Sequence, residues 1–206
     1  MIDGLNAGEK VVTNGVFSVD AAAQLNNQRS MMNRLVGEQE TAEETIEQVD
    51  PEIVTAGARQ DLSAALGAYI ALKDDLIEGE PEEIRSSLAH LRSVAGDLGE
   101  REDLSSFSSD WNSHVKNFKS HLGLLLKEKD VEGWRTAFSP FSQVMIHWVL
   151  EFGNPGKSEI FVQHCPMAND DEGGDWLSYD SNIRNPYYGE AMMACGVTTE
   201  ALPYSE

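Results

Sequence analysis

The sequence predicts a mainly α-helical fold: an up-down four-helix bundle, followed by an irregular C-terminal segment and preceded by a short N-terminal β segment. Three observations lead to this prediction. Apolar residues recur at three- and four-residue steps in four stretches between residues 58 and 148. Short connections separate these stretches, as is typical of antiparallel helices. Residues 153–206 instead combine glycines, prolines, aromatic residues and both cysteines.

A short β segment is expected at the start of the chain. Residues 11–13 and 16–19 are rich in valine, and Asn14-Gly15 between them favours a tight turn. Two such strands bury too little surface to be stable alone, so we expect them to close a larger β-rich module. Residues 37–52 are acidic with few apolar side chains, which predicts a flexible or partly helical linker. The predicted domains are therefore 1–36, 37–52 and 53–202.

The first two helices have clear ends in the sequence. The first carries an apolar stripe from Ala58 to Leu76, and Gly79 is expected to stop it. The second is expected to begin at Pro81, because proline is favoured in the first helical turn. A glycine just after the last apolar position commonly ends a helix, so Gly99 marks its end.

The third and fourth helices carry most of the large aromatic side chains. Their apolar stripes run over 104–125, at near-heptad spacing, and over 134–148. Asp130 precedes the fourth stripe and can cap that helix. Pro140 lies inside the fourth stripe and is expected to bend the helix. We assign Met145, within this stripe, to the core.

The charge excludes one class of partner. The chain has 35 acidic and 15 basic residues, a formal net charge of -20. Phosphate backbones would be repelled, so we expect no nucleic-acid partner. The plain interpretation of the charge is solubility, and attraction of cations is the alternative. No apolar run approaches the roughly 18 residues that a membrane span needs, so no span is expected in this chain.

The most distinctive motif is His164-Cys165-Pro166-Met167, which places an imidazole, a thiol and a thioether within four residues. A second cluster, Met192-Met193-Ala194-Cys195, adds two thioethers and a thiol. Thiolates and thioethers are soft donors that select Cu(I) and, less exclusively, Zn(II). The motif lacks the paired Cys-x-x-Cys pattern of zinc sites. The structural alternative is a Cys165–Cys195 disulfide.

Other side chains are weaker candidates. Trp176 lies between the two clusters, where it is expected to anchor the segment on the bundle or, alternatively, to stack over a bound cation. His114 and His121 are seven residues apart on one predicted helix and could share a face, but surface positions are the plainer interpretation. His90 and His147 are weaker still as metal ligands.

Two parts of the chain resemble known families. Residues 4–15, with Asp20-Ala21, are similar to the closing strands of periplasmic adaptor (membrane fusion) subunits of resistance-nodulation-division efflux pumps. The second resemblance is to a small helical DUF3347-type domain, of unknown function, which is found appended to bacterial copper and silver efflux adaptors and as a free-standing periplasmic protein. The stretches that resemble its signature are 162–168, 175–178, 183–189 and 192–196.

The resemblance implies a function. The chain would be the C-terminal part of a periplasmic adaptor subunit, associated with the inner membrane in the full-length protein. Its partners would be an inner-membrane pump and an outer-membrane channel, and its cargo Cu(I) or Ag(I), with Zn(II) possible. The implied metal ligands are His164, Cys165, Met167, Met192 and Cys195, with Met193 and Trp176 as possible additions.

No enzymatic activity is expected. Cys165 adjoins His164, but neighbours in sequence rarely form a nucleophile–base pair, because the base must meet the thiol in space and be oriented by a third group. No glycine-rich phosphate loop follows a predicted strand. The alternative function is a structural or protein-interaction module in which a Cys165–Cys195 disulfide fastens the C-terminal segment.

Overall fold

The structure is a computed structural model that describes residues 56–99 and 111–204. The chain divides into two units, Met1–Thr45 and Ile46–Glu206. All described residues belong to the second unit. The β segment predicted at 1–36 and the acidic linker predicted at 37–52 therefore lie outside the described residues and stay predictions.

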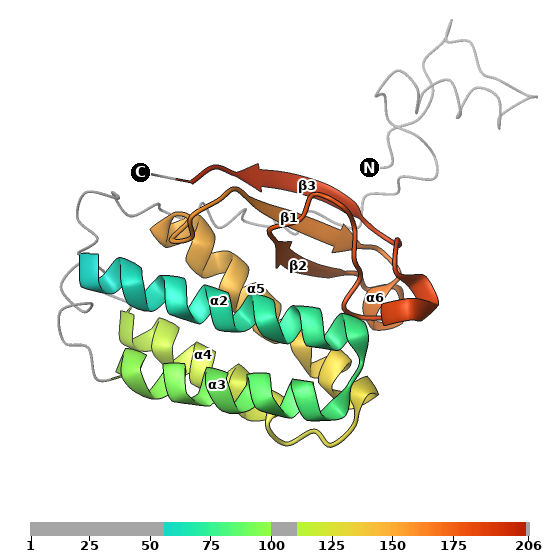
Figure 1. Ribbon diagram of the computed structural model, residues 1–206, viewed down its shortest axis with the longest axis horizontal. Helices are drawn as coiled ribbons and strands as arrows, with labels where there is room; N and C mark the ends of the chain where they lie inside the picture. The colour runs from blue at the N-terminus through green and yellow to red at the C-terminus, as the bar shows by residue number, and fades with distance from the viewer. Residues whose placement is uncertain (1–55, 100–110, 205–206) are drawn as a thin grey trace, which may run out of the picture. The chain divides into compact units, whose positions relative to one another are not determined.

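Four long helices make up most of the described residues, which confirms the mainly helical bundle (Figure 1). Helix α2 packs on α3, α3 on α4, and α4 on α5, as in an up-down arrangement. None of these helices is both long enough and apolar enough to cross a bilayer. The helices are α2 (Ala56–Glu78), α3 (Pro81–Gly99), α4 (Trp111–Leu125) and α5 (Val131–Phe152).

The helix ends follow local sequence signals. Gly79 has a φ of +78°, a left-handed conformation that glycine adopts without steric cost, and it ends α2. Helix α3 begins at Pro81 and ends at Gly99, as predicted. The Asp130 side chain accepts a hydrogen bond of 2.9 Å from the backbone nitrogen of Gly133 and caps α5. Helix α5 continues through Pro140.

The bundle core is aromatic. The indole of Trp148 stacks on Phe118 with ring centroids 5.1 Å apart and contacts Trp111 at 5.6 Å. Met145 is buried among them, as predicted. The largest fully buried side chains of the helices include Trp111, Trp134, Tyr69, Phe118, Phe138 and Phe141.

A three-stranded antiparallel sheet follows the bundle, where the sequence predicted an irregular C-terminal segment. Its strands are β1 (Ile160–Cys165), β2 (Gly174–Ser178) and β3 (Val197–Leu202), in the order β2-β1-β3. β2 is short and β3 is almost entirely exposed, so neither shows the alternation of apolar and polar residues that predicts a strand.

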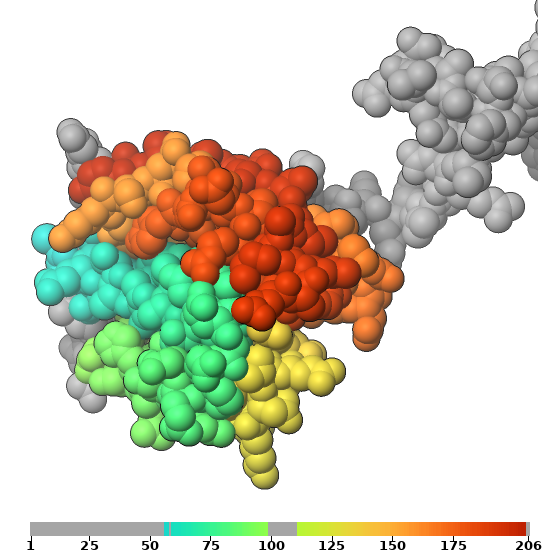
Figure 2. Space-filling view, turned by 45° about the vertical axis from the view of Figure 1, so that its right-hand side comes forward, coloured from blue at the N-terminus to red at the C-terminus, as the bar shows by residue number. Residues whose placement is uncertain are grey.

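The sheet lies on one side of the bundle, over α2 and α5, and α3 and α4 form the layer beyond them (Figure 1). Strand β2 supplies the main contact, with α5. Two short turns of helix connect the strands: α6 (Ala168–Asp171) before β2 and the 3₁₀ turn η2 (Gly189–Met192) before β3. In Figure 2 the C-terminal segment gathers along the upper part of the domain, with the helices below it.

Candidate metal-binding site

The two cysteines meet at one end of the sheet. Cys165 is the last residue of β1, and Cys195 lies between η2 and β3. Their sulfur atoms are 3.2 Å apart, and both thiols are free. Cys165 is fully buried, whereas Cys195 is partly exposed. The fold thus unites two soft donors separated by about thirty residues of chain.

The turn that carries Cys195 is held by a buried amide. The Asn185 side chain donates a 2.9 Å hydrogen bond to the carbonyl of Cys195, and its backbone nitrogen donates to the carbonyl of Met193 at 2.9 Å. Gly196 follows with a φ of +143°. A Cβ atom there would lie 2.8 Å from the carbonyl oxygen of His164, so glycine is needed for the close approach of this turn to β1.

The sulfur contact affects protonation. The hydrogen bond with Cys165 raises the pKa of the Cys195 thiol above its usual value, and desolvation raises it further. Cys195 is therefore a neutral thiol at neutral pH. A metal ion binds the deprotonated form, so metal binding at this pair would release protons.

Two of the three thioethers in these motifs are near the surface. Met167 follows Cys165 by two residues and is 42% exposed, and Met192 is 37% exposed. The backbone carbonyl of Met192 accepts a 3.0 Å hydrogen bond from the nitrogen of Cys195, so this thioether belongs to the same turn. Met193 is partly buried. Flexible thioethers at these positions are free to swing toward a metal ion.

Trp176 belongs to the core. Its side chain is fully buried on β2, and its ring meets Tyr187 edge-on at 5.9 Å. A Cβ atom at Gly196 would lie 2.9 Å from the Trp176 ring, so the ring supports the turn that carries Cys195. This geometry fits the anchoring role better than stacking over a bound ion.

His164 is held away from the cysteine pair. Its Nδ1 atom lies 2.7 Å from Oδ1 of Asp175, its direct partner in the β1–β2 register. Asp175 also accepts a 2.8 Å hydrogen bond from Gln143 on α5. Successive strand residues face opposite sides of a sheet, so His164 and Cys165 diverge. Among the described residues, His164 and the two cysteines do not form a group with ligand atoms within 4.8 Å of one another.

A left-handed turn follows the His-Cys-Pro-Met motif. Asn169, Asp170 and Asp171 have φ values of 53°, 57° and 69°. Such a conformation costs about 1–2 kcal/mol per residue for most side chains, and asparagine and aspartate tolerate it best. The Asn169 amide donates to Ser139 of α5 at 2.9 Å and to the Gly173 carbonyl at 2.8 Å, which secures the turn. Backbone strain of this kind is concentrated at functional sites.

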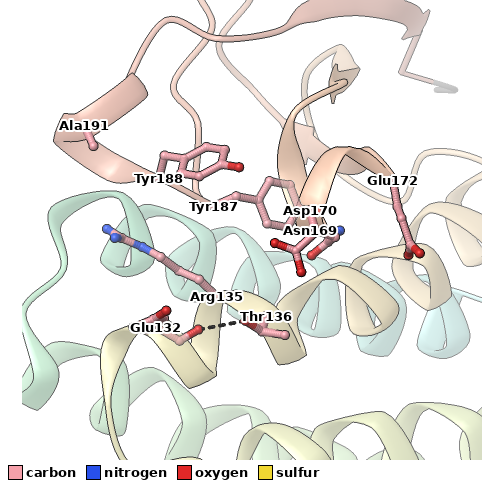
Figure 3. A pocket seen from close by; sticks show the side chains of 9 residues that line it. All are labelled: Glu132, Arg135, Thr136, Asn169, Asp170, Glu172, Tyr187, Tyr188 and Ala191. Atoms are coloured by element: carbon pink, nitrogen blue, oxygen red, sulfur yellow. Dashed lines mark hydrogen bonds between the residues drawn. The ribbon is translucent and has the colours of Figure 1, made fainter.

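An acidic pocket of about 680 Å³ opens beside this turn, between α5 and the segment that follows β1 (Figure 3). Its lining includes three acidic residues, which we call the pocket carboxylates: Glu132, Asp170 and Glu172. The basic residue of the lining, Arg135, donates to the carbonyl of Leu76 at the end of α2.

Tyr188 connects the pocket with the thiols. Its ring lies across the pocket from α5 in Figure 3, and its hydroxyl donates to the carbonyl of Met167. Desolvation raises the pKa of Tyr188, and so do Cys165, the neighbouring Asp171 and Asp170, and Cys195. The pocket therefore lies beside the turn that follows Cys165.

A second cluster of potential metal ligands lies in the helical bundle. From the sequence alone, its histidines are weak candidates. His114 on α4 meets His147 and Glu151 on α5. The i,i+4 spacing of His147 and Glu151 was the available signal in the sequence, because such residues share a helix face. His121, the other histidine considered on α4, instead bonds the carbonyl of Asn117 on its own helix.

Comparison with known proteins gives one match. Residues 65–157 match the family model described as a protein of unknown function, DUF3347. This is 93 of the 206 residues, from the middle of α2 to just past α5. The match agrees with the predicted DUF3347-type resemblance for the helical part of the domain, and the stretches between residues 162 and 196 that suggested the resemblance lie beyond the matched residues. No curated protein and no solved structure matches the chain.

Proposed function

We propose that the C-terminal end of this domain binds a soft metal ion, Cu(I) or Ag(I), as cargo between the sulfurs of Cys165 and Cys195. The observation that carries the proposal is the 3.2 Å approach of these two free thiols from separate parts of the chain. Met167 and Met192, two and three residues from the cysteines along the chain, have exposed side chains and would supply further soft donors. His164, held by Asp175, lies outside this donor set.

The spacing of the sulfurs suits a metal ion. With zinc–sulfur bonds of about 2.3 Å, two thiolates of a tetrahedral zinc site lie about 3.8 Å apart. The pair would open by roughly half an ångström to admit the ion. A disulfide of about 2.05 Å would require the sulfurs to approach by about 1 Å. Binding of an ion in tetrahedral geometry therefore needs a smaller displacement of the two sulfurs than a disulfide does.

The surroundings favour cations. The pocket carboxylates lie near Tyr188, which is itself close to both thiols. Clustered charge of one sign raises the local concentration of the opposite ion and the rate at which it arrives. The pocket carboxylates would thereby raise the concentration of cations beside the turn that Tyr188 and Met167 join.

The wider role that we propose is capture and transfer in an efflux system. The domain would serve a periplasmic adaptor, take up the ion and pass it by ligand exchange toward an inner-membrane pump that works with an outer-membrane channel. Support for this part comes from the sequence resemblance of residues 4–15, which lie outside the described residues. Zn(II) is an alternative cargo, because thiolates also bind it.

A Cu(I) competition titration tests the site. The full chain, reduced and kept anaerobic, is titrated with Cu(I) against a chromophoric Cu(I) chelator. We expect a Cys165→Ser, Cys195→Ser variant to lose at least about 100-fold in affinity, since both thiolates are removed. Met167→Leu and Met192→Leu should each weaken binding, and Met145→Leu, in the buried core, is the matched control. Unchanged affinity in the double cysteine variant would overturn the proposal.

The same sulfur contact favours a second function, a structural disulfide that fastens the turn at Cys195 to β1. Thiol titration with and without reductant separates the two. A structural bridge leaves no free thiol in the protein purified without reductant, and Ag(I) then fails to bind. If two thiols can be titrated without reductant, and Ag(I) protects both from the thiol reagent, the result supports the metal site.

A further inference from the structure

Two imidazoles, one from each of two neighbouring helices, converge on one carboxylate oxygen. The Nε2 atom of His114 on α4 lies 3.1 Å from Oε2 of Glu151 on α5. The Nε2 atom of His147, also on α5, lies 3.2 Å from the same oxygen. Within the part of the chain that the structure describes, this is the one group of three histidine, cysteine or acidic side chains with ligand atoms all within 4.8 Å of one another.

The helices hold this cluster in place. His147 and Glu151 are four residues apart and project from one face of α5. His114 comes from the adjacent antiparallel helix, with its ring 5.6 Å from that of His147. The His114 ring also makes a T-shaped contact with Phe152, with ring centroids 5.4 Å apart, which restricts the rotation of the imidazole. Donors on packed helices keep their spacing better than donors on loops.

The cluster is partly buried on one side and open on the other. The His114 and Glu151 side chains are 12% and 13% exposed, whereas His147 is 40% exposed. Phe152 and Trp111, whose rings meet at 5.8 Å, form an apolar wall on the buried side. Charges interact more strongly beside such a wall than in water. A cation would be stabilised by the carboxylate and remain reachable from solvent on the side of His147.

The interatomic distances match those of a metal centre. With bonds of about 2.0 Å to nitrogen and oxygen, two ligands of a tetrahedral zinc ion lie about 3.3 Å apart. The distances of 3.1 and 3.2 Å fall close to this value. Two imidazoles and one carboxylate form a nitrogen- and oxygen-rich set, which suits Zn(II) and Cu(II) rather than the soft Cu(I) ion.

We propose that His114, His147 and Glu151 form a second metal site, for a divalent cation of the Zn(II) or Cu(II) class. Three protein ligands leave the fourth position open, toward the exposed side of His147. The site shares no residue with the cysteine pair, and its existence does not depend on the proposed function. The domain would then hold a divalent ion in the bundle apart from any soft ion at the sheet.

Zinc titration of the full, reduced chain tests the site. The Cys165→Ser, Cys195→Ser variant lacks both thiols but keeps all three ligands of the bundle site. Calorimetry should therefore show that this variant still binds one Zn(II). X-ray absorption of that complex should show only nitrogen and oxygen neighbours at about 2.0–2.1 Å. In the wild-type chain with zinc at both sites, the X-ray absorption spectrum should also show sulfur neighbours of zinc at about 2.3 Å.

Substitutions in the thiol-free background assign the ligands. His147→Gln and Glu151→Gln should each lower the zinc affinity at least about tenfold, since even supporting residues of metal sites have effects of that size. His121→Gln, on the surface of α4, is the matched control and should leave affinity unchanged. The His147 side chain is 40% exposed, so its variant should stay folded by circular dichroism even if a His114 variant does not. Absence of zinc binding in the thiol-free chain, or wild-type affinity in a His147→Gln, Glu151→Gln variant, would overturn the proposal.

Discussion

The phenolic oxygen of Tyr69 on α2 lies 2.6 Å from the hydroxyl oxygen of Ser142 on α5. It also accepts a 3.0 Å hydrogen bond from the backbone nitrogen of Leu177 on β2. All three residues are buried. Burial raises the pKa of Tyr69 well above its usual value, so the phenol stays protonated at every physiological pH. One side chain therefore joins two helices and the sheet.

Removing this hydroxyl should weaken the whole domain. A Tyr69→Phe change leaves the Leu177 nitrogen and the Ser142 hydroxyl buried without this partner, which costs about 1–3 kcal/mol. Urea denaturation should show this loss in the free energy of unfolding. Tyr204→Phe, at an exposed tyrosine, is the control and should have no effect. Equal stability of the two variants would contradict the role of Tyr69.

The difference in exposure predicts the order of thiol modification. Cys165 is fully buried and Cys195 partly exposed, so iodoacetamide should modify Cys195 first in the reduced chain. Peptide mass spectrometry after timed alkylation identifies the modified residue. One equivalent of Ag(I) should protect both thiols together. Faster modification of Cys165, or protection of one cysteine alone, would contradict the arrangement described here.

The pocket carboxylates should speed the arrival of cations. Changing all three to their amides is expected to slow Ag(I) binding about tenfold at low salt, because the acidic potential is lost. Stopped-flow absorbance measures the rate. In about 1 M salt, where the Debye length is roughly 3 Å, the difference should vanish. Amide substitution of Glu82, Glu83 and Asp97, exposed on α3, gives the same net charge and should have little effect.

Two glycine-to-alanine changes should have opposite effects on stability. Gly189 has a φ of +54°, and a Cβ atom there would lie 2.8 Å from the carbonyl oxygen of Ile77. Gly189→Ala is therefore expected to lower the free energy of unfolding by about 1–3 kcal/mol. Gly67 lies on the exposed face of α2 with nothing within 4 Å of the added atom. Gly67→Ala should raise stability by about 0.5–1 kcal/mol. Thermal unfolding of both variants checks the signs.

Much of the bundle could be predicted because its signals are local. Pro81 and Gly99 bound α3, and Asp130 caps α5, through interactions with their own or neighbouring turns. The apolar stripes identify the core faces for the same reason. The strands were harder to predict. β3 is exposed at nearly every position and is defined by its hydrogen bonds to β1, which the sequence does not display.

For the candidate sites too, the sequence indicated the chemistry of single residues but not which residues meet in space. Soft donor chemistry identified Cys165 and Cys195, and the fold does bring their sulfurs together. Sequence proximity also suggested His164, but strand geometry turns it toward Asp175 instead. His114 and His147 received little weight, because they lie 33 positions apart on separate helices. Their meeting depends on how α4 is aligned along α5, which helical periodicity cannot specify.

The sheet defines how much chain is needed for this domain to fold. The matched family segment ends at residue 157, before β1, yet Trp176 and Leu177 of β2 are fully buried in the same core as the helices. A chain cut at that point would uncover the apolar side of α5 and leave the hydroxyl of Tyr69 without its strand partner. Such a truncated protein should self-associate rather than remain a monomer. The minimal folding unit is thus larger than the family segment, and the C-terminal strands complete it.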